Sequence, residues 1–190
     1  MSLIKDLAMR KSRNQSVLQV AELPQIVTGY TGAKLRSALK YATKGGDLIR
    51  VTRGIYVFDK NYSRWEMGNK LRTPSYISLY SVLQSKGVVF QPYTSIFLVS
   101  QRSQRSEVDG QEYIYRKIKD SILLNPMGIE VQNGVSVASL ERAICDKLYL
   151  DQDEHFDNLR SVDFGEMERL NDNVYGNDKH ISIFVSKHKL

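Results

Sequence analysis

Residues 28–58 of this chain read TGYTGAKLRSALKYATKGGDLIRVTRGIYVF, and in this run a helical pattern gives way to two strand-like patterns. The apolar residues of its first half recur at i, i+3, i+4 and i+7 and so share one helix face: Leu35, Ala38, Leu39 and Ala42. Gly45-Gly46 follows, a pair that readily takes the left-handed backbone at the end of a helix. Residues 48–51 and 55–58 are β-branched and aromatic, with Gly54 in the tip between them, and therefore predict a hairpin.

The predicted helix carries small and basic residues on the face opposite the apolar one. At about 100° per residue, that face holds Ala33, Ser37, Lys40 and Lys44. Its flanks hold Lys34 and Tyr41 on one side, Arg36 and Thr43 on the other. Such a helix, followed by a hairpin that carries arginines, is the pattern of a winged helix-turn-helix. An ordinary helix–hairpin unit with merely solvated charges is the alternative, but the agreement of caps, period and charge favours the winged helix.

The segments upstream complete this pattern. Residues 1–11 and 17–26 are expected to be helices, with Pro24 lying in the second or ending it. Thr31 is the expected cap of the recognition helix. The order of helix, helix, recognition helix and hairpin is the order that a winged helix requires.

Charge is distributed unevenly along the chain. Residues 1–60 hold 11 Lys and Arg against 4 Asp and Glu, a net of +7, whereas residues 61–190 hold 16 against 17, a net of −1. The polar stretch 59–63 separates the two parts. We therefore expect an α+β protein with a winged helix-turn-helix DNA-binding domain over residues 1–60 and a mixed α+β effector domain over residues 61–190. A basic excess confined to one domain indicates a polyanionic partner, with nucleic acid ahead of a membrane surface.

The DNA-binding candidates follow from how a winged helix docks. Its recognition helix enters the major groove, and its wing reaches phosphates or the minor groove. Ser37 and Lys40, near the centre of the outward face, are the candidates for contacts with base edges. The candidates for phosphate contacts are Lys34, Arg36, Lys44, Arg50 and Arg53 through their charge, and Tyr30, Thr31 and Thr52 through a hydroxyl group.

The remainder of the chain predicts helices and strands in turn. Helices are expected over residues 64–71, over residues 75–85 after Thr73-Pro74, over residues 140–150 behind a Ser139 cap, and near 165–171 and 178–188. Strands are expected over residues 95–100, 112–118, 129–131 and 135–137. Asp109-Gly110 and Asn133-Gly134 are dipeptides that close hairpins.

Signals for catalytic or metal chemistry are weak. Cys145 lies in a predicted helix with no histidine near it in sequence, and we interpret it as a small apolar residue. His155, His180 and His188 lack the spacing of zinc ligands. The acidic run 151–157 is interpreted as a solvated loop, with a divalent-metal site as the alternative. A phosphate-binding glycine loop is absent from the sequence, so no cofactor and no metal are expected.

One enzymatic alternative stays open, a metal-dependent nuclease domain. It pairs Asp109 with Glu130 on neighbouring strands of the second domain. Gln132 stands where many such nucleases place a lysine, which weakens this reading. The single cysteine and the lack of a signal peptide or a long apolar run predict a cytoplasmic protein with no membrane partner.

Three blocks of sequence follow one another along the chain: Leu39 with residues 46–51 and 53–56; residues 74–78 with Leu83 and Gly87; and residues 138–143 leading to 146–150. Together they resemble the AbiEi-type antitoxins of type IV toxin–antitoxin (abortive infection) systems. The resemblance implies a non-enzymatic, DNA-binding transcriptional autorepressor and antitoxin. It implies two partners, an operator in double-stranded DNA with inverted repeats and a nucleotidyltransferase-type toxin that the second domain opposes.

The second domain offers a candidate surface for the toxin. We expect it on the helix over residues 139–150, at Glu141, Arg142 and Lys147. A DNA-binding adaptor without a toxin partner is the third functional reading.

Overall fold

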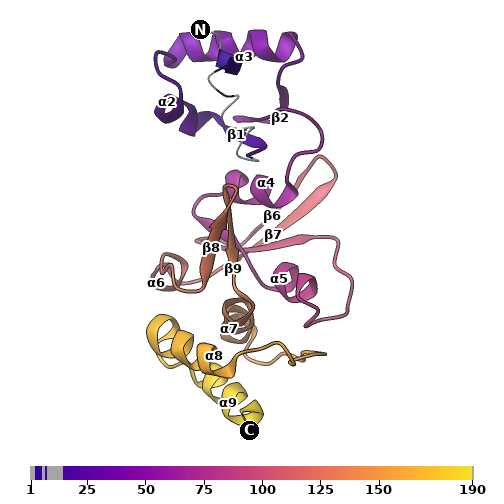
Figure 1. Ribbon diagram of the computed structural model, residues 1–190, viewed down its shortest axis with the longest axis vertical. Helices are drawn as coiled ribbons and strands as arrows, with labels where there is room; N and C mark the ends of the chain where they lie inside the picture. Colours follow the sequence, from indigo (N-terminus) through magenta and orange to yellow (C-terminus); the bar gives the residue numbers. More distant parts are fainter. Residues whose placement is uncertain (1–2, 6, 8–14, 190) are drawn as a thin grey trace. The chain divides into compact units, whose positions relative to one another are not determined.

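The computed structural model describes residues 3–5, 7 and 15–189 (Figure 1). It is a mixed α+β structure with a three-stranded sheet and a six-stranded sheet. The chain divides into two units, residues 1–71 (unit 1) and residues 72–190 (unit 2). Among the described residues, helices that combine the length and the apolar character needed to cross a membrane are absent.

Unit 1 builds its sheet from three short strands. In chain order it contains β1 (Val17–Gln19), the 3₁₀ turn η1 (Val20–Glu22), α2 (Leu23–Ile26), α3 (Gly32–Lys44), β2 (Ile49–Thr52), β3 (Ile55–Val57) and α4 (Arg64–Leu71). The strand order is β1-β3-β2, and both pairings are antiparallel. Gly54 supplies the positive φ of the β2–β3 tip, at 78°. The hairpin and α3 are therefore confirmed.

The core of unit 1 lies between α3 and its neighbours. Leu35, Leu39 and Ala42 of α3 are buried, and they cluster with Leu18 and Leu48. In Figure 1, α3 faces β1 and β2 within unit 1. Of the helix expected over residues 1–11, residues 3–5 and 7 are described and helical, and the rest lies outside the described residues.

The helix expected over residues 17–26 is wrong in its first half. Residues 17–19 form β1, which pairs with β3 so that Val17 lies opposite Val57. Only Leu23–Ile26 is α-helical, and Pro24 lies in its first turn, where a missing N–H costs no hydrogen bond. Pairing with a strand distant in sequence therefore prevails over a weak local helical pattern.

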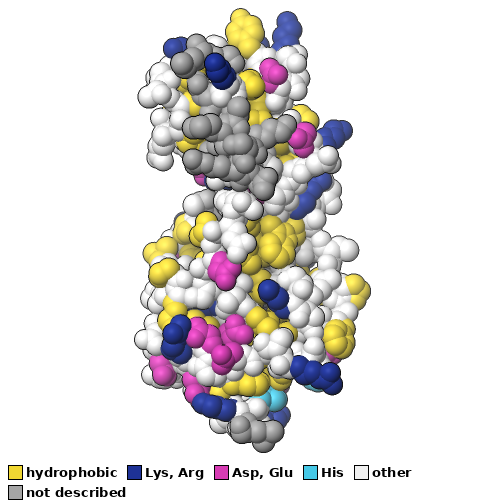
Figure 2. All heavy atoms as spheres, in the orientation of Figure 1, with side chains coloured by type: hydrophobic (Ala, Val, Ile, Leu, Met, Phe, Trp, Pro, Cys, Tyr) yellow, Lys and Arg dark blue, Asp and Glu magenta, His cyan; other side chains and the backbone are white. Residues whose placement is uncertain are grey.

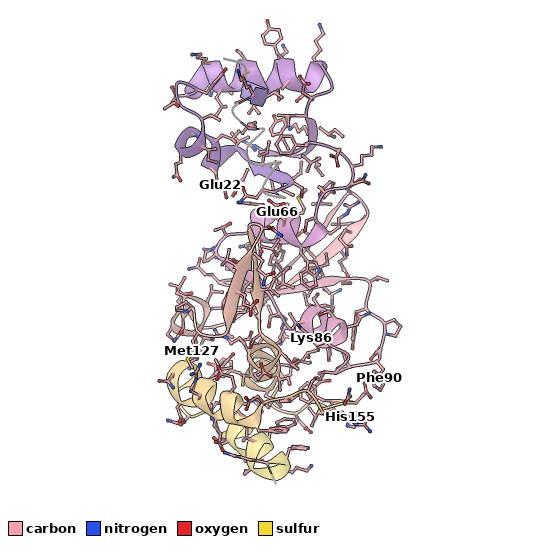
Figure 3. The ribbon with its side chains drawn as sticks, viewed as in Figure 1. Glu22, Glu66, Lys86, Phe90, Met127 and His155 are labelled. Atoms are coloured by element: carbon pink, nitrogen blue, oxygen red, sulfur yellow. The ribbon has the colours of Figure 1, made fainter. Side chains whose placement is uncertain are left out.

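The division between the units falls after Leu71, whereas the sequence places a boundary at residues 59–63. The difference is α4. The Glu66 Oε2 atom accepts hydrogen bonds from the backbone N–H of Ser16 at 2.7 Å, from its hydroxyl at 2.8 Å and from the N–H of Val17 at 3.2 Å (Figure 3). Lys70 pairs with Glu22 at 2.5 Å. These contacts tie α4 to β1 and η1.

Unit 2 is built around the six-stranded sheet. Its strands are β4 (Ser75–Ile77), β5 (Ile96–Ser100), β6 (Gln104–Val108), β7 (Gln111–Lys117), β8 (Ile129–Gln132) and β9 (Val135–Ala138), in the order β6-β7-β5-β4-β9-β8. The β5–β7 and β4–β9 pairs are parallel, and the others are antiparallel. The predicted turns Asp109-Gly110 and Asn133-Gly134 close the β6–β7 and β8–β9 hairpins, and all four residues have positive φ.

The helices of unit 2 agree with the sequence except that the helix predicted over residues 75–85 begins only at Tyr80, and the short helix Asp120–Leu123 and the π-helical turn Asn171–Tyr175 were not predicted. The helices are α5 (Tyr80–Ser85), α6 (Asp120–Leu123), α7 (Leu140–Asp151), α8 (Phe164–Leu170), the π-helical turn η2 (Asn171–Tyr175) and α9 (Lys179–His188). Residues 75–77 were expected to open a helix, but they form β4, which is enclosed by β5 and β9. Ser139 caps α7 as predicted, because its hydroxyl accepts from the Arg142 N–H. In Figure 1, α7 lies between β9 and the pair α8 and α9.

Candidate nucleic-acid interface

Helix α3 is held in place at both of its ends. Thr31 occupies the N-cap position in extended backbone, and its carbonyl accepts from the N–H groups of Lys34 at 3.1 Å and Leu35 at 3.4 Å. Its hydroxyl makes no capping hydrogen bond and remains exposed, so Thr31 caps through its backbone alone. At the other end, the Gly45 N–H donates to the Tyr41 carbonyl at 2.8 Å, and Gly46 takes a φ of 81°.

The outward face of α3 carries positive charge without any negative charge. The helix GAKLRSALKYATK contains no Asp or Glu. Its four cations are exposed, and they do not form an ion pair with any carboxylate of the described residues: Lys34, Arg36, Lys40 and Lys44. Arg36, Lys40 and Lys44 follow one another at a spacing of four, where like charges destabilise a helix by roughly 0.2–0.5 kcal/mol per pair. An anion bound along this face would relieve that repulsion.

Ser37 lies on the same face. It is exposed between the first and last cations of α3, as the sequence predicts for a residue that contacts base edges. The Lys34 ammonium group makes a cation–π contact with Tyr30, because its Nζ lies 5.1 Å from the centre of the Tyr30 ring. Tyr30 itself is half-buried, so this pair joins the loop before α3 to the basic face.

The hairpin supplies the remaining candidates. Arg50 on β2 and Arg53 in the turn are exposed, and neither is ion-paired with a described carboxylate. The Arg50 Nε–H donates to the Thr52 carbonyl at 3.5 Å, a long bond that positions the guanidinium only loosely. Thr52 is half-buried beside the irregular step in the β2–β3 pairing. The ten predicted DNA-binding residues therefore lie on α3, the residues before it and one hairpin.

The expected toxin-binding surface on α7 requires correction. Arg142 is fully buried at 0% exposure, and Lys147 is 5% exposed. Only Glu141 reaches the surface, half-exposed, where its Oε1 accepts from the Asp163 N–H at 3.3 Å. Helix α7 packs against α5, β9, α8 and α9, so Arg142 and Lys147 point into the unit.

Arg142 and Asp146 form a buried pair inside unit 2. The Arg142 guanidinium donates to the carbonyls of Ile122 and Met127, both at 2.7 Å, and to the Tyr76 hydroxyl at 3.2 Å. Its Nε lies 3.7 Å from the Asp146 carboxylate. We call these two residues and their hydroxyl partners the α7 network.

Three hydroxyl groups complete the α7 network at Asp146. They belong to Ser78 at 2.7 Å, Tyr175 at 2.8 Å and Tyr76 at 3.1 Å, and all three donate to the carboxylate. Burial raises the pKa of Asp146 above its usual range, although Arg142 and these hydroxyl donors oppose the shift. The sequence did not reveal this network, because its members are separated by up to 99 residues, from Tyr76 to Tyr175.

Lys147 is satisfied within unit 2 as well. Its Nζ lies 2.6 Å from both Asp151 and Glu154, and 4.4 Å from the centre of the Tyr80 ring. Asp151 also pairs with Arg116 at 2.6 Å. The prediction of a merely solvated acidic loop is therefore wrong for Asp151 and Glu154, which neutralise two cations.

The nuclease alternative loses its geometric basis. Asp109 lies in the β6–β7 turn and Glu130 lies in β8, so the two residues occupy opposite edges of the six-stranded sheet rather than neighbouring strands. The four strand spacings from β7 to β8 amount to about 19 Å, which is too far for one shared metal ion. Within the described ranges, clusters of three or more His, Cys, Asp or Glu that suit a metal ion do not occur.

Unit 2 also contains the buried Cys145 and a pocket that all three histidines line. Cys145 is fully buried on α7, as expected of a small apolar residue, and burial raises its pKa. A pocket of about 760 Å³ opens between residues 152–159 and α9, and His155, His180 and His188 all line it. His188 Nδ1 lies 2.9 Å from the Phe184 carbonyl, and Glu154, which also lines the pocket, is ion-paired with Lys147.

On the face drawn in Figure 2, Lys and Arg side chains protrude from both units, and in unit 2 a group of Asp and Glu side chains lies next to some of them. The six cations of α3 and the hairpin, by contrast, form no ion pair with a described carboxylate. The α3 face and the hairpin are therefore the strongest candidate site for a macromolecule. A comparison with protein-family models finds no match to this chain, and a comparison with curated proteins finds none either.

Proposed function

We propose that unit 1 is a winged helix-turn-helix that binds double-stranded DNA, with α3 as the recognition helix and the β2–β3 hairpin as the wing. The order of its elements supports this proposal. Residues 3–5 and 7 are helical, and β1, α2, α3, β2 and β3 follow with β1 beside β3, an order and pairing that suit a winged helix. Docking of α3 in the major groove would direct Ser37 and Lys40 to base edges.

The observation that carries the proposal is the unneutralised charge. Residues 1–71 hold 13 Lys and Arg against 5 Asp and Glu, a net of +8, and the six cations of α3 and the hairpin have no acidic partner among the described residues. Unpaired and exposed cations are the electrostatic footprint of a phosphate backbone. Residues 72–190 have a net charge of −2, which makes unit 2 a poor polyanion binder by comparison.

We further propose that the protein is a transcriptional autorepressor and the antitoxin of a type IV toxin–antitoxin system, acting against a nucleotidyltransferase-type toxin. This part rests on the resemblance of three sequence blocks to AbiEi-type antitoxins. The second and third blocks meet in the α7 network, where Tyr76 and Ser78 donate to Asp146. Those blocks therefore maintain the fold of unit 2, and the toxin-binding surface lies elsewhere on the unit.

Binding to labelled duplex DNA tests the first proposal. Fluorescence anisotropy of the full-length protein with a fluorescein-labelled 30-base-pair duplex, measured from low to moderate salt, should give a linear fall of log K with log salt. Each phosphate contact contributes a slope of roughly −0.9. An affinity that does not depend on salt, or no binding at low salt, would overturn the proposal.

A toxicity rescue tests the antitoxin proposal. Full-length protein co-expressed with the gene beside its own should restore growth if that gene encodes the toxin. Substituting Lys40 and Lys44 by Ala should weaken repression and leave rescue intact, because those residues lie in unit 1. A neighbouring gene without toxicity, or rescue that fails with the parent protein, would contradict it.

A further inference from the structure

Tyr41 is an exposed aromatic residue of α3. It is 74% exposed, more than any other large apolar side chain among the described residues of the whole protein. Hydrogen bonds, ion pairs and ring contacts that would join its side chain to another described residue are absent. Exposed aromatic area of this size is unfavourable in water, and it is common where a surface binds a partner.

The surroundings of Tyr41 restrict what that partner is. Ser37 precedes it by four residues and Lys44 follows it by three, so both are its neighbours on the surface of α3. Lys40 is adjacent in sequence on the same outward side. The helix contains no acidic residue that would suit a basic protein partner. An aromatic ring within an unneutralised basic face fits the grooved surface of duplex DNA, which offers both phosphates and apolar base edges.

We propose that Tyr41 determines part of the sequence preference of the protein by placing its ring against the C5-methyl group of a thymine in the major groove. This inference rests on the proposed function of unit 1. The methyl group is the one apolar feature that the major groove displays, and only a T·A pair carries it. The cations of α3 around Tyr41 can bind the phosphate groups of the DNA backbone. The Tyr41 ring is neutral, so the contact that suits it is the apolar C5-methyl group. The hydroxyl is not required for this contact.

The test compares thymine with deoxyuridine, which lacks only that methyl group. A duplex is first selected from a random pool by the full-length protein, and each thymine of the selected site is then replaced singly by deoxyuridine. For the parent protein, one such replacement should lower the affinity about fourfold, the equivalent of burying one methyl group, about 0.8 kcal/mol. Tyr41→Phe should show the same loss, because it keeps the ring.

Tyr41→Ala should bind thymine and deoxyuridine at that position equally. Ala is the best helix former, and the Tyr41 side chain makes no hydrogen bond or ring contact within the described residues, so the variant keeps its fold. Thr43→Ala is the matched control on the same helix. The Thr43 hydroxyl bonds to the Leu39 carbonyl at 2.8 Å, and this variant should keep the fourfold loss.

Two results would overturn the inference alone: a parent protein that is insensitive to every deoxyuridine replacement, or a Tyr41→Ala variant that keeps the full penalty. In both cases salt-dependent DNA binding would persist, so the proposed function would stand. A parent protein that selects no duplex at all would overturn the inference together with the proposed function.

Discussion

The two units use their charged side chains in opposite ways. In unit 1 the cations of α3 and the hairpin lie in solvent without an acidic partner among the described residues. In unit 2, six cations are within 4 Å of a carboxylate: Arg105, Arg116, Arg142, Lys147, Arg169 and Lys189. Two of them, Arg142 and Lys147, are buried. The contrast indicates that the cations of α3 and the hairpin are available to an external anion, whereas Arg142 and Lys147 stabilise the interior of unit 2.

The largest effect is expected where a charge of unit 2 is removed from the interior. Asp146→Ala leaves Arg142 buried without its counterion and removes one acceptor from the hydroxyl groups of Tyr76, Ser78 and Tyr175, of which Tyr175 keeps the Arg142 carbonyl at 3.3 Å. Breaking a buried pair in this way costs about 3–5 kcal/mol of unfolding free energy. Urea denaturation followed by far-UV circular dichroism measures it. Asp153→Ala, which removes an exposed carboxylate of the same unit, should change the value by less than about 0.5 kcal/mol.

A loss below about 1 kcal/mol for Asp146→Ala would show that the α7 network is not structural. Such a result would contradict the statement that buried charges stabilise unit 2, and with it the contrast between the two units.

A smaller effect concerns the pH dependence of stability. Burial raises the pKa of Asp151, but hydrogen bonds and ion pairs with Arg116 and Lys147 outweigh it and hold the pKa below its usual value. A carboxylate with a lowered folded-state pKa contributes stability above its unfolded pKa of about 4, and this contribution is lost as the pH falls through the folded-state pKa. Parent protein should therefore lose more stability than Asp151→Asn between pH 6 and pH 3. Parallel curves for the two proteins would contradict the assignment.

The smallest effect should appear where unit 1 loses charge. Lys40→Ala removes a cation that has like-charged neighbours four residues away on both sides, Arg36 and Lys44. Since each such pair is unfavourable by roughly 0.2–0.5 kcal/mol and Ala favours helix, the variant should be as stable as the parent or slightly more stable. Thermal unfolding checks this. A loss of more than about 1 kcal/mol would mean that Lys40 has a structural partner after all.

Local signals account for the parts of the fold that were predictable. The helix α3 follows from a 3.6-residue period that ends in two glycines, and the hairpin tips follow from Arg53-Gly54, Asp109-Gly110 and Asn133-Gly134. Those signals depend only on neighbouring residues. The exposed positions of Ser37 and Lys40 follow from the same period, which is why most of the candidate DNA face could be placed from the sequence.

Features that depend on distant partners were not predictable. β1 and β4 are strands because β3, β5 and β9 offer backbone partners. Their own residues, VLQ and SYI, include residues that favour strands but are too few to predict one. β6 reads QRSEV, a polar edge strand without an apolar pattern. Arg142 and Lys147 are charged residues that a local rule assigns to the surface. Their burial depends on Tyr76, Met127 and Glu154, which the fold brings to α7.

The most direct test of the contrast between the units is the salt slope of DNA binding after a matched loss of charge. Lys40→Ala/Lys44→Ala removes two cations from α3. Lys86→Ala/Lys179→Ala removes two exposed cations of unit 2 that have no ion pair among the described residues. With duplex DNA and fluorescence anisotropy, the α3 double variant should lose about two units from the magnitude of the slope of log K against log salt, and the unit 2 double variant should keep the parent slope. Equal slopes for the two double variants would contradict the account.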